Sequence, residues 1–195
     1  MIWIIKSGII HSLNADNLSI KSILCIDTIL HQSKQMKIVQ YLAQDLLESD
    51  YDSRMTENVA QDFYSYVHNH TNFLEKVDPT SAKKELNYVL AVEDESENIL
   101  GFRYFYWEKP MSRIHFFAVV MDESIKRQGY AIKTLLEGVA IGNKLGINRF
   151  YFTINSERST ERDGLVAGYK RVCTELVGKG NQFEVIYPDK GFILK

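Results

Sequence analysis

The stretch KRQGYA, residues 126–131, has the residue types of an anion-binding loop. It follows an apolar run that is typical of a strand and precedes residues with helical periodicity. A loop between a strand and a helix presents backbone N–H groups without helical partners, and the helix dipole places a partial positive charge behind them. Gly129 lets the backbone approach an anion without a Cβ in the way, and Lys126, Arg127 and Lys133 add charge nearby. The stretch therefore predicts a phosphate-binding site.

The stretch does not follow the two standard nucleotide-binding patterns. It lacks the glycine spacing and the Lys-Ser/Thr ending of a P-loop, and it lacks the three glycines of the dinucleotide fingerprint. A glycine at such a junction is also compatible with a simple turn. The sequence favours a different anion, with a turn as the alternative.

Other residues that could do chemistry form no pattern. His68 and His70 lie two positions apart and so do not share a face of a helix. Cys25 and Cys173 give neither a metal pattern nor a disulfide framework, and Cys173 is expected to be a small buried residue. We expect no metal.

The first half of the chain is predicted to contain two strands followed by two helices. MIWIIKSGII and residues 22–29 have strand composition. Apolar residues at helical spacing predict an amphipathic helix around residues 39–47 and a second around residues 59–77. They are Val39, Leu42, Ala43, Leu46 and Leu47 in the first, and Val59, Phe63, Tyr66, Val67, Leu74 and Val77 in the second.

The second half is predicted to carry most of the sheet. LNYVLAVE and ILGFRYFYWE flank the polar turn DESEN as a β-hairpin, and RIHFFAVVM is a third strand. A helix follows the glycine loop and ends near Gly146, and NRFYFTIN is the next strand. SERSTERDGLVAG predicts a short helix, and VCTELV and FEVIYP predict strands around the hairpin turn GKGN. We expect an α+β fold with a mixed, mostly antiparallel sheet of about seven strands and about four helices on its faces.

Length and composition are those of one globular domain over residues 1–195. With 45% hydrophobic and 25% charged residues the chain can bury a full core. The 23 basic and 25 acidic residues give a net charge of -2, which provides no general attraction for nucleic acid or an anionic membrane. No segment approaches the roughly 20 apolar residues of a transmembrane helix. We expect a cytoplasmic protein with no nucleic-acid or membrane partner.

The segment IHFFAVVMDESIKRQGYAIKTLLEGVAIGNKLGINRFYFTIN resembles the acetyl-CoA-binding core of the GNAT N-acetyltransferases. The loop of that family reads Gln/Arg-x-x-Gly-x-Gly/Ala; here Gly129 and Ala131 match, and Lys126 replaces the leading residue. The order strand, loop, helix, strand matches as well. The resemblance covers about residues 86–190 and implies a sheet whose central strands splay apart around acetyl-CoA.

The resemblance implies cofactor contacts at defined positions. The backbone of Val119 and Met121, with Val120 between them, would pair with the pantetheine arm, and the Val119 N–H would polarise the thioester carbonyl. Asn155 matches an asparagine that family members place near this arm, although a turn or helix cap explains it equally well. The loop residues expected to contact acetyl-CoA, mainly through backbone N–H groups around the pyrophosphate, are Lys126, Arg127, Gln128, Gly129, Tyr130 and Ala131.

Direct transfer to an amine benefits from a base, because amines with pKa values of about 8 to 10 are mostly protonated at neutral pH. Several family members carry a glutamate eleven residues before the leading loop position, and His115 stands there in this chain. An imidazole with a pKa of about 6.5 can act as the base, with a packed core histidine as the alternative.

The general acid of the family is usually a tyrosine four residues before a Gly-Phe pair that opens the next strand. Gly168 and Tyr169 resemble that pair, which puts Gly164 at the tyrosine position. In a different register Tyr169 itself is the candidate acid, with a structural ring as the alternative. Water could also protonate the thiolate, because a thiol pKa of about 8.5 makes that step undemanding.

These features predict an acetyl-CoA-dependent N-acetyltransferase that moves an acyl group directly to an amine of a small molecule or a protein. Its partners would be acetyl-CoA and the amine acceptor, and a monomer and a homodimer both stay open. The alternative is a GNAT-fold module that binds acyl-CoA or a protein partner with weak catalysis, favoured by the glycine at position 164.

Overall fold

The structure is a computed structural model that describes residues 2–6, 9–13, 36–153, 160–187 and 190–194. The chain divides into two compact units, Met1–Gln35 and Met36–Lys195. In the first unit β1 (Ile2–Lys6) and β2 (Ile9–Leu13) pair antiparallel, so the predicted N-terminal strand is a hairpin of two. The predicted strand at residues 22–29 lies outside the described residues. One domain over residues 1–195 stays a prediction.

The second unit is built on a sheet of seven strands in the order β3-β4-β5-β6-β7-β8-β9. Neighbours pair antiparallel except β6 with β7 and β7 with β8, which are parallel. The predicted mixed, mostly antiparallel sheet is therefore confirmed. The strands are β3 (Lys37–Leu42), β4 (Asn87–Glu93), β5 (Ile99–Glu108), β6 (Arg113–Met121), β7 (Arg149–Thr153), β8 (Gln182–Tyr187) and β9 (Lys190–Leu194).

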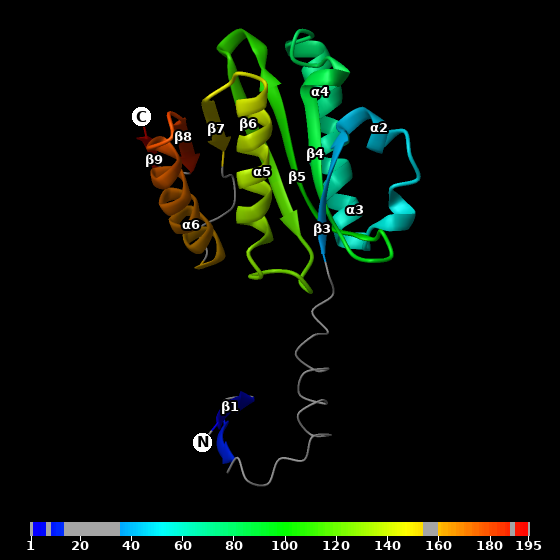
Figure 1. The fold of residues 1–195 in the computed structure, drawn as a ribbon. Coiled ribbons are helices and arrows are strands. Elements are labelled where there is room, and N and C mark those ends of the chain that lie inside the picture. Colours follow the sequence, from blue (N-terminus) through cyan, green and yellow to red (C-terminus); the bar gives the residue numbers. More distant parts are fainter. Residues whose placement is uncertain (1, 7–8, 14–35, 154–159, 188–189, 195) are drawn as a thin grey trace. The chain divides into compact units, whose positions relative to one another are not determined.

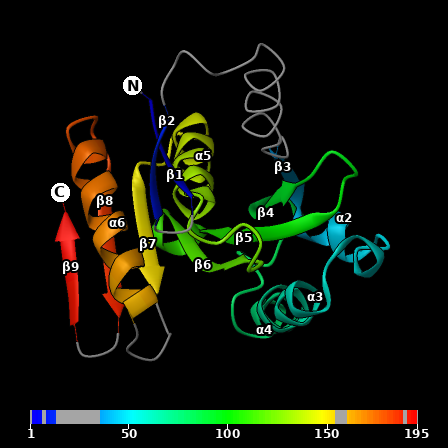
Figure 2. The same ribbon diagram turned by 90° about the horizontal axis from the view of Figure 1, so that it is seen from below.

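Helices cover both faces of this sheet. In Figure 2, α5 (Tyr130–Lys144) and α6 (Thr160–Val177) lie on one face, and α3 (Glu57–Phe63) and α4 (Asn69–Val77) on the other. A π-helical turn, η3 (Tyr64–His68), joins α3 to α4. The shorter elements are α2 (Ala43–Leu47), η2 (Asp52–Arg54), η4 (Lys84–Leu86) and η5 (Lys109–Met111). None of the helices in the described part of the chain has the length and apolar character of a membrane span.

Two sequence predictions about elements are wrong. Residues 39–42 belong to β3, whose six residues all pair with β4, so helical spacing was overridden by strand pairing. VCTELV forms the last turns of α6 and not a strand, because Tyr169, Val172 and Cys173 stand at helical spacing and are buried against the sheet. GKGN is accordingly a helix-to-strand connection, and the last strand of the sheet is β9.

Each face of the sheet has its own hydrophobic core. The core under α5 and α6 is rich in phenylalanine, including Phe105, Phe116, Phe150 and Phe152. The core under α3 and α4 is centred on Phe63, with Phe102 and Tyr104 from β5. Cys173 is fully buried in the first core, as expected for a small apolar side chain.

Candidate functional site

The two central strands β6 and β7 separate part-way along their length. Only residues 114–116 of β6 pair with β7, at residues 150–152, whereas β5 stays paired with β6 as far as Met121. Residues 118–121 of β6 therefore have no strand partner on the β7 side among the described residues. The predicted splay of the central strands is confirmed, and Figure 1 shows β6 running on beyond β7.

A β-bulge in β6 accompanies the separation. Tyr104 pairs with Ala118 and Phe105 pairs with Phe116, which leaves Phe117 as the extra residue. A bulge bends its strand and increases the local twist. The bulge therefore lies where β6 leaves β7.

The register of β5 and β6 determines which backbone groups face the gap. The Asp122 N–H donates to the Leu100 carbonyl at 2.7 Å, one position beyond the pair of Gly101 and Met121. Opposed residues of an antiparallel ladder alternate between hydrogen-bonded and non-hydrogen-bonded pairs. By this alternation Val120 turns its backbone toward β5, and Val119 and Met121 turn theirs toward the gap. Only the side chain of Val120 can therefore contact a ligand in the gap.

The glycine loop forms the N-terminus of α5 beside this gap. Gly129 is the N-cap with φ of 84°, a left-handed conformation that glycine adopts without strain. Within the described residues, the N–H groups of Gly129, Tyr130 and Ala131 have no backbone acceptor, since the first helical bonds come from Ile132 and Lys133. A Cβ on Gly129 would meet no atom within 4 Å, so the space on that side of the N-cap is open. Three N–H donors at a helix N-terminus fit a phosphate group.

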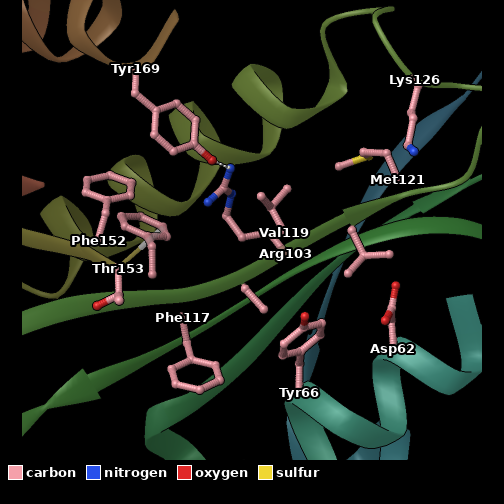
Figure 3. Close-up of a pocket in the computed structure, with 13 residues that line it drawn as sticks. Asp62, Tyr66, Arg103, Phe117, Val119, Met121, Lys126, Phe152, Thr153 and Tyr169 are labelled. Carbon is pink, nitrogen blue, oxygen red and sulfur yellow. Dashed lines mark hydrogen bonds between the residues drawn. The ribbon is translucent and has the colours of Figure 1, made fainter. Parts of the chain in front are cut away.

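A cleft of about 380 Å³ occupies the gap (Figure 3). It is bordered by β5, β6 and the end of β7, by the middle of α6 on one face of the sheet, and by α3 and η3 on the other. The lining residues are Asp62, Tyr66, Arg103, Phe116, Phe117, Ala118, Val119, Val120, Met121, Lys126, Phe152, Thr153 and Tyr169.

Three features occur together here: splayed parallel strands, a bulge before the splay, and a glycine loop that caps the next helix. The chain has a GNAT-like fold. No family model and no curated protein matches the sequence.

Similar solved structures are acetyltransferases. A ribosomal-protein-alanine N-acetyltransferase from Brucella melitensis is 13% identical to this chain, with a TM-score of 0.46. An aminoglycoside acetyltransferase from an uncultured soil sample is 14% identical, with a TM-score of 0.47. Each of the two comparisons covers 71% of this chain and 90% of the other. A GNAT N-acetyltransferase from Escherichia coli in complex with CoA is 14% identical over 58% of each chain, with a TM-score of 0.37.

The side chains of Lys126 and Gln128 in the glycine loop are engaged within the protein. Lys126 lines the cleft and forms an ion pair with Glu123, and Gln128 donates to the Ser124 carbonyl at 2.8 Å. Arg127 is exposed and has φ of 63°. These contacts favour anion binding through the backbone, as the sequence predicts. Asn155, the remaining predicted contact, lies outside the described residues.

Tyr169 is 1% exposed and lines the cleft from α6. Its hydroxyl accepts a hydrogen bond of 2.6 Å from Arg103. Because the phenol accepts from Arg103, its own proton must point elsewhere. Tyr169 lies within a helix and does not open a strand, so the family rule that put the acid at Gly164 does not apply to this segment. The hydroxyl of Tyr169 is consistent with the predicted acid role.

His115 lies in a packed part of the fold and does not line the cleft. Its Nδ1 lies 2.8 Å from the Tyr106 hydroxyl and its Nε2 lies 3.4 Å from Thr153 Oγ1. The rings of Tyr106, Phe117 and Tyr151 surround it. Burial lowers the pKa of His115 to about 3, with smaller contributions from the nearby His70 and Arg113, and it is not among the cleft-lining residues. These surroundings favour the packed alternative, and the base role of His115 stays a prediction.

Asp62 is the carboxylate that sequence reasoning missed. Among the described residues it is the only acidic side chain that lines the cleft, and burial raises its pKa while the charge of Lys126 opposes the rise. Tyr66 lies one helical turn further on and points toward the same part of the cleft (Figure 3). A polar position on an amphipathic helix gives no signal by itself, because most such positions face solvent.

Proposed function

We propose that this chain is an N-acyltransferase that moves an acyl group directly from acyl-CoA to an amine. One observation carries the proposal: within the described residues, the edge of β6 beyond Phe116 has no strand partner on the β7 side, and it runs beside a helix N-terminus whose first three N–H groups have no backbone acceptor. A long ligand with a phosphate end and an amide-bearing arm would satisfy both at once.

The donor side of the cleft would use mainly backbone groups. When bound, acyl-CoA supplies the activated thioester. The N–H groups of Gly129, Tyr130 and Ala131 would donate to its pyrophosphate, and the backbone of Met121 would pair with its amide-bearing arm. The N–H of Val119 would donate to the thioester oxygen, where negative charge develops during attack.

The acceptor side of the cleft would use Asp62. An amine arrives as an ammonium ion at neutral pH and must lose one proton before its nitrogen can attack. Asp62 would take that proton, helped by the raised pKa of its carboxylate. The N–C bond then forms while the C–S bond breaks, and the nitrogen passes its second proton to water. The thiolate gains a proton from water or from Tyr169, which would then regain its own proton from water.

Binding of the donor tests the proposal directly. Acetyl-CoA at millimolar concentration should raise the Tm of the wild-type chain, because a ligand that binds only the folded state stabilises it. Gly129→Asp should abolish this shift by placing a carboxylate before the N–H groups. Gly129→Ala is the matched control: it has the same left-handed strain and no clash, but no charge, and should keep most of the shift.

The same samples separate an enzyme from a binding module. Thiol release from acetyl-CoA is followed with a panel of small amines, antibiotics and peptides. Release that depends on both the amine and an intact Gly129 supports the transferase. A melting shift with no release across the panel favours the module. The absence of any shift in the wild-type chain contradicts both the transferase and a module that binds acyl-CoA.

A further inference from the structure

Arg103 is a buried cation in the wall of the cleft. It stands in the middle of β5, directly opposite Val119, and 1% of its surface is exposed. Its Nε donates to Thr134 Oγ1 at 3.2 Å, and its Nη2 donates to the Ala131 carbonyl at 2.8 Å and to the Tyr169 hydroxyl at 2.6 Å. Figure 3 shows the guanidinium beneath Tyr169 in the cleft.

All of these partners are neutral. The other near neighbours are the rings of Phe116 and Tyr169, with centroids 5.3 and 5.5 Å from the guanidinium carbon. Among the described residues no carboxylate pairs with Arg103, whereas Arg54 and Arg113 each pair with glutamate. Buried charges in proteins are normally paired, because removing an ion from water is costly. The missing counter-charge is therefore expected from a ligand in the cleft.

The pyrophosphate does not account for this charge. Arg103 binds the carbonyl of Ala131, and helix carbonyls point away from the N-terminus. The guanidinium thus lies behind the N–H groups that would hold the phosphates, on the side of Val119 and Tyr169. In the proposed function these two residues flank the thioester and not the nucleotide.

We propose that the acyl donor carries a carboxylate at the end of a short acyl chain, and that Arg103 binds it. The donor is then a CoA thioester of a dicarboxylic acid, and the reaction leaves an acidic acyl group on the amine. This inference rests on the proposed function. Three of the five guanidinium N–H groups already donate to Thr134, Ala131 and Tyr169, so the two N–H groups of Nη1 would donate to the carboxylate. A neutral acyl chain cannot accept such charge-assisted hydrogen bonds.

Calorimetric titration of the full chain with CoA thioesters tests the inference without an acceptor. Malonyl-CoA and isovaleryl-CoA form a matched pair, because a carboxylate replaces an isopropyl group of similar shape. Glutaryl-CoA extends the series by chain length. We expect malonyl-CoA or glutaryl-CoA to bind at least about tenfold more tightly than isovaleryl-CoA, as a charge-assisted hydrogen bond in a dry site would give. Arg103→Gln should bring this ratio close to one, and Arg103→Lys should keep part of it.

The outcomes separate this inference from the proposed function. If the wild-type protein binds isovaleryl-CoA as tightly as both acidic thioesters, the inference is overturned and the proposed transferase function is unaffected. This measurement uses the wild-type protein alone, so it does not depend on the folding of an Arg103 variant. If Arg103→Gln weakens the binding of all thioesters equally, the inference is also overturned, because Arg103 would then interact with the CoA portion of the ligand. If none of the thioesters binds, acetyl-CoA included, the result contradicts the proposed function itself.

Discussion

Two charged side chains, Asp62 and Arg103, border the cleft from opposite faces of the sheet. The sequence predicts the anion loop because local residue types define it, but it does not reveal Asp62, whose role depends on α3 packing across β6. Arg103 did have a signal, since it is the one charge inside the apolar run of ILGFRYFYW. A charge in a strand buried on both faces requires a partner, and Arg103 lines the cleft.

The base is tested by comparing Asp62→Asn with His115→Gln. Asp62→Asn should lower kcat by about 10² to 10⁴ and leave the acetyl-CoA melting shift in place, because it removes a proton acceptor and no donor contact. His115→Gln should lower the melting temperature first, since His115 is packed among aromatic rings. Amine-dependent thiol release and thermal melts measure both. A folded His115→Gln chain with the greater loss of kcat would return the base role to His115.

At the scale of elements, local periodicity predicted β4, β5, β6 and α5 well and failed at β3 and in the last turns of α6. In β3 the apolar residues also fit a helix, and pairing with β4 decides between them. In α6 the valines and threonine of VCTELV have strand composition, whereas helical spacing places Val172 and Cys173 in the core. Short apolar runs are ambiguous until their partners are known.

Two glycines give a matched test of how α5 packs on the sheet. A Cβ on Gly138 of α5 would lie 2.5 Å from Cε1 of Phe116, so Gly138→Ala should force that ring to move and cost about 1 to 3 kcal/mol of unfolding free energy. Gly164→Ala in α6 meets no atom within 4 Å and should add about 0.4 to 1 kcal/mol. Urea unfolding measures both. A neutral Gly138→Ala would show that the Phe116 ring has room to shift.

At the scale of the whole molecule, composition and element order predict only an α+β sheet, whereas the splay was predicted by resemblance to a family. The splay depends on where β7 diverges from β6, which no periodicity encodes.

Two histidines lie close together on the α4 side of β6. His70 stacks on Phe117 at 3.7 Å between ring centroids, and its charge would lower the pKa of His115.

A hydrogen-bond chain places a proton on Nδ1 of His70. Asn87 donates through Nδ2 to two carbonyls, so its Oδ1 accepts the Tyr104 hydroxyl proton at 2.9 Å. Tyr104 can then only accept from Nδ1–H of His70, 3.2 Å away. Burial lowers the pKa of His70 to about 4 and that of His115 to about 3.

These two histidines should make stability fall in mild acid. Their unfolded pKa values are about 6.5, so below that pH unfolding takes up protons that the fold excludes, and stability is lost until the folded values near 3 to 4 are reached. Each histidine can contribute a slope of up to about 1.4 kcal/mol per pH unit. Urea midpoints at pH 7.0 and 5.0 measure the loss, and a double variant, His70→Gln with His115→Gln, should reduce it whatever its stability at pH 7.0. Equal midpoints at both pH values in the wild-type chain would mean that both imidazoles accept protons within the fold.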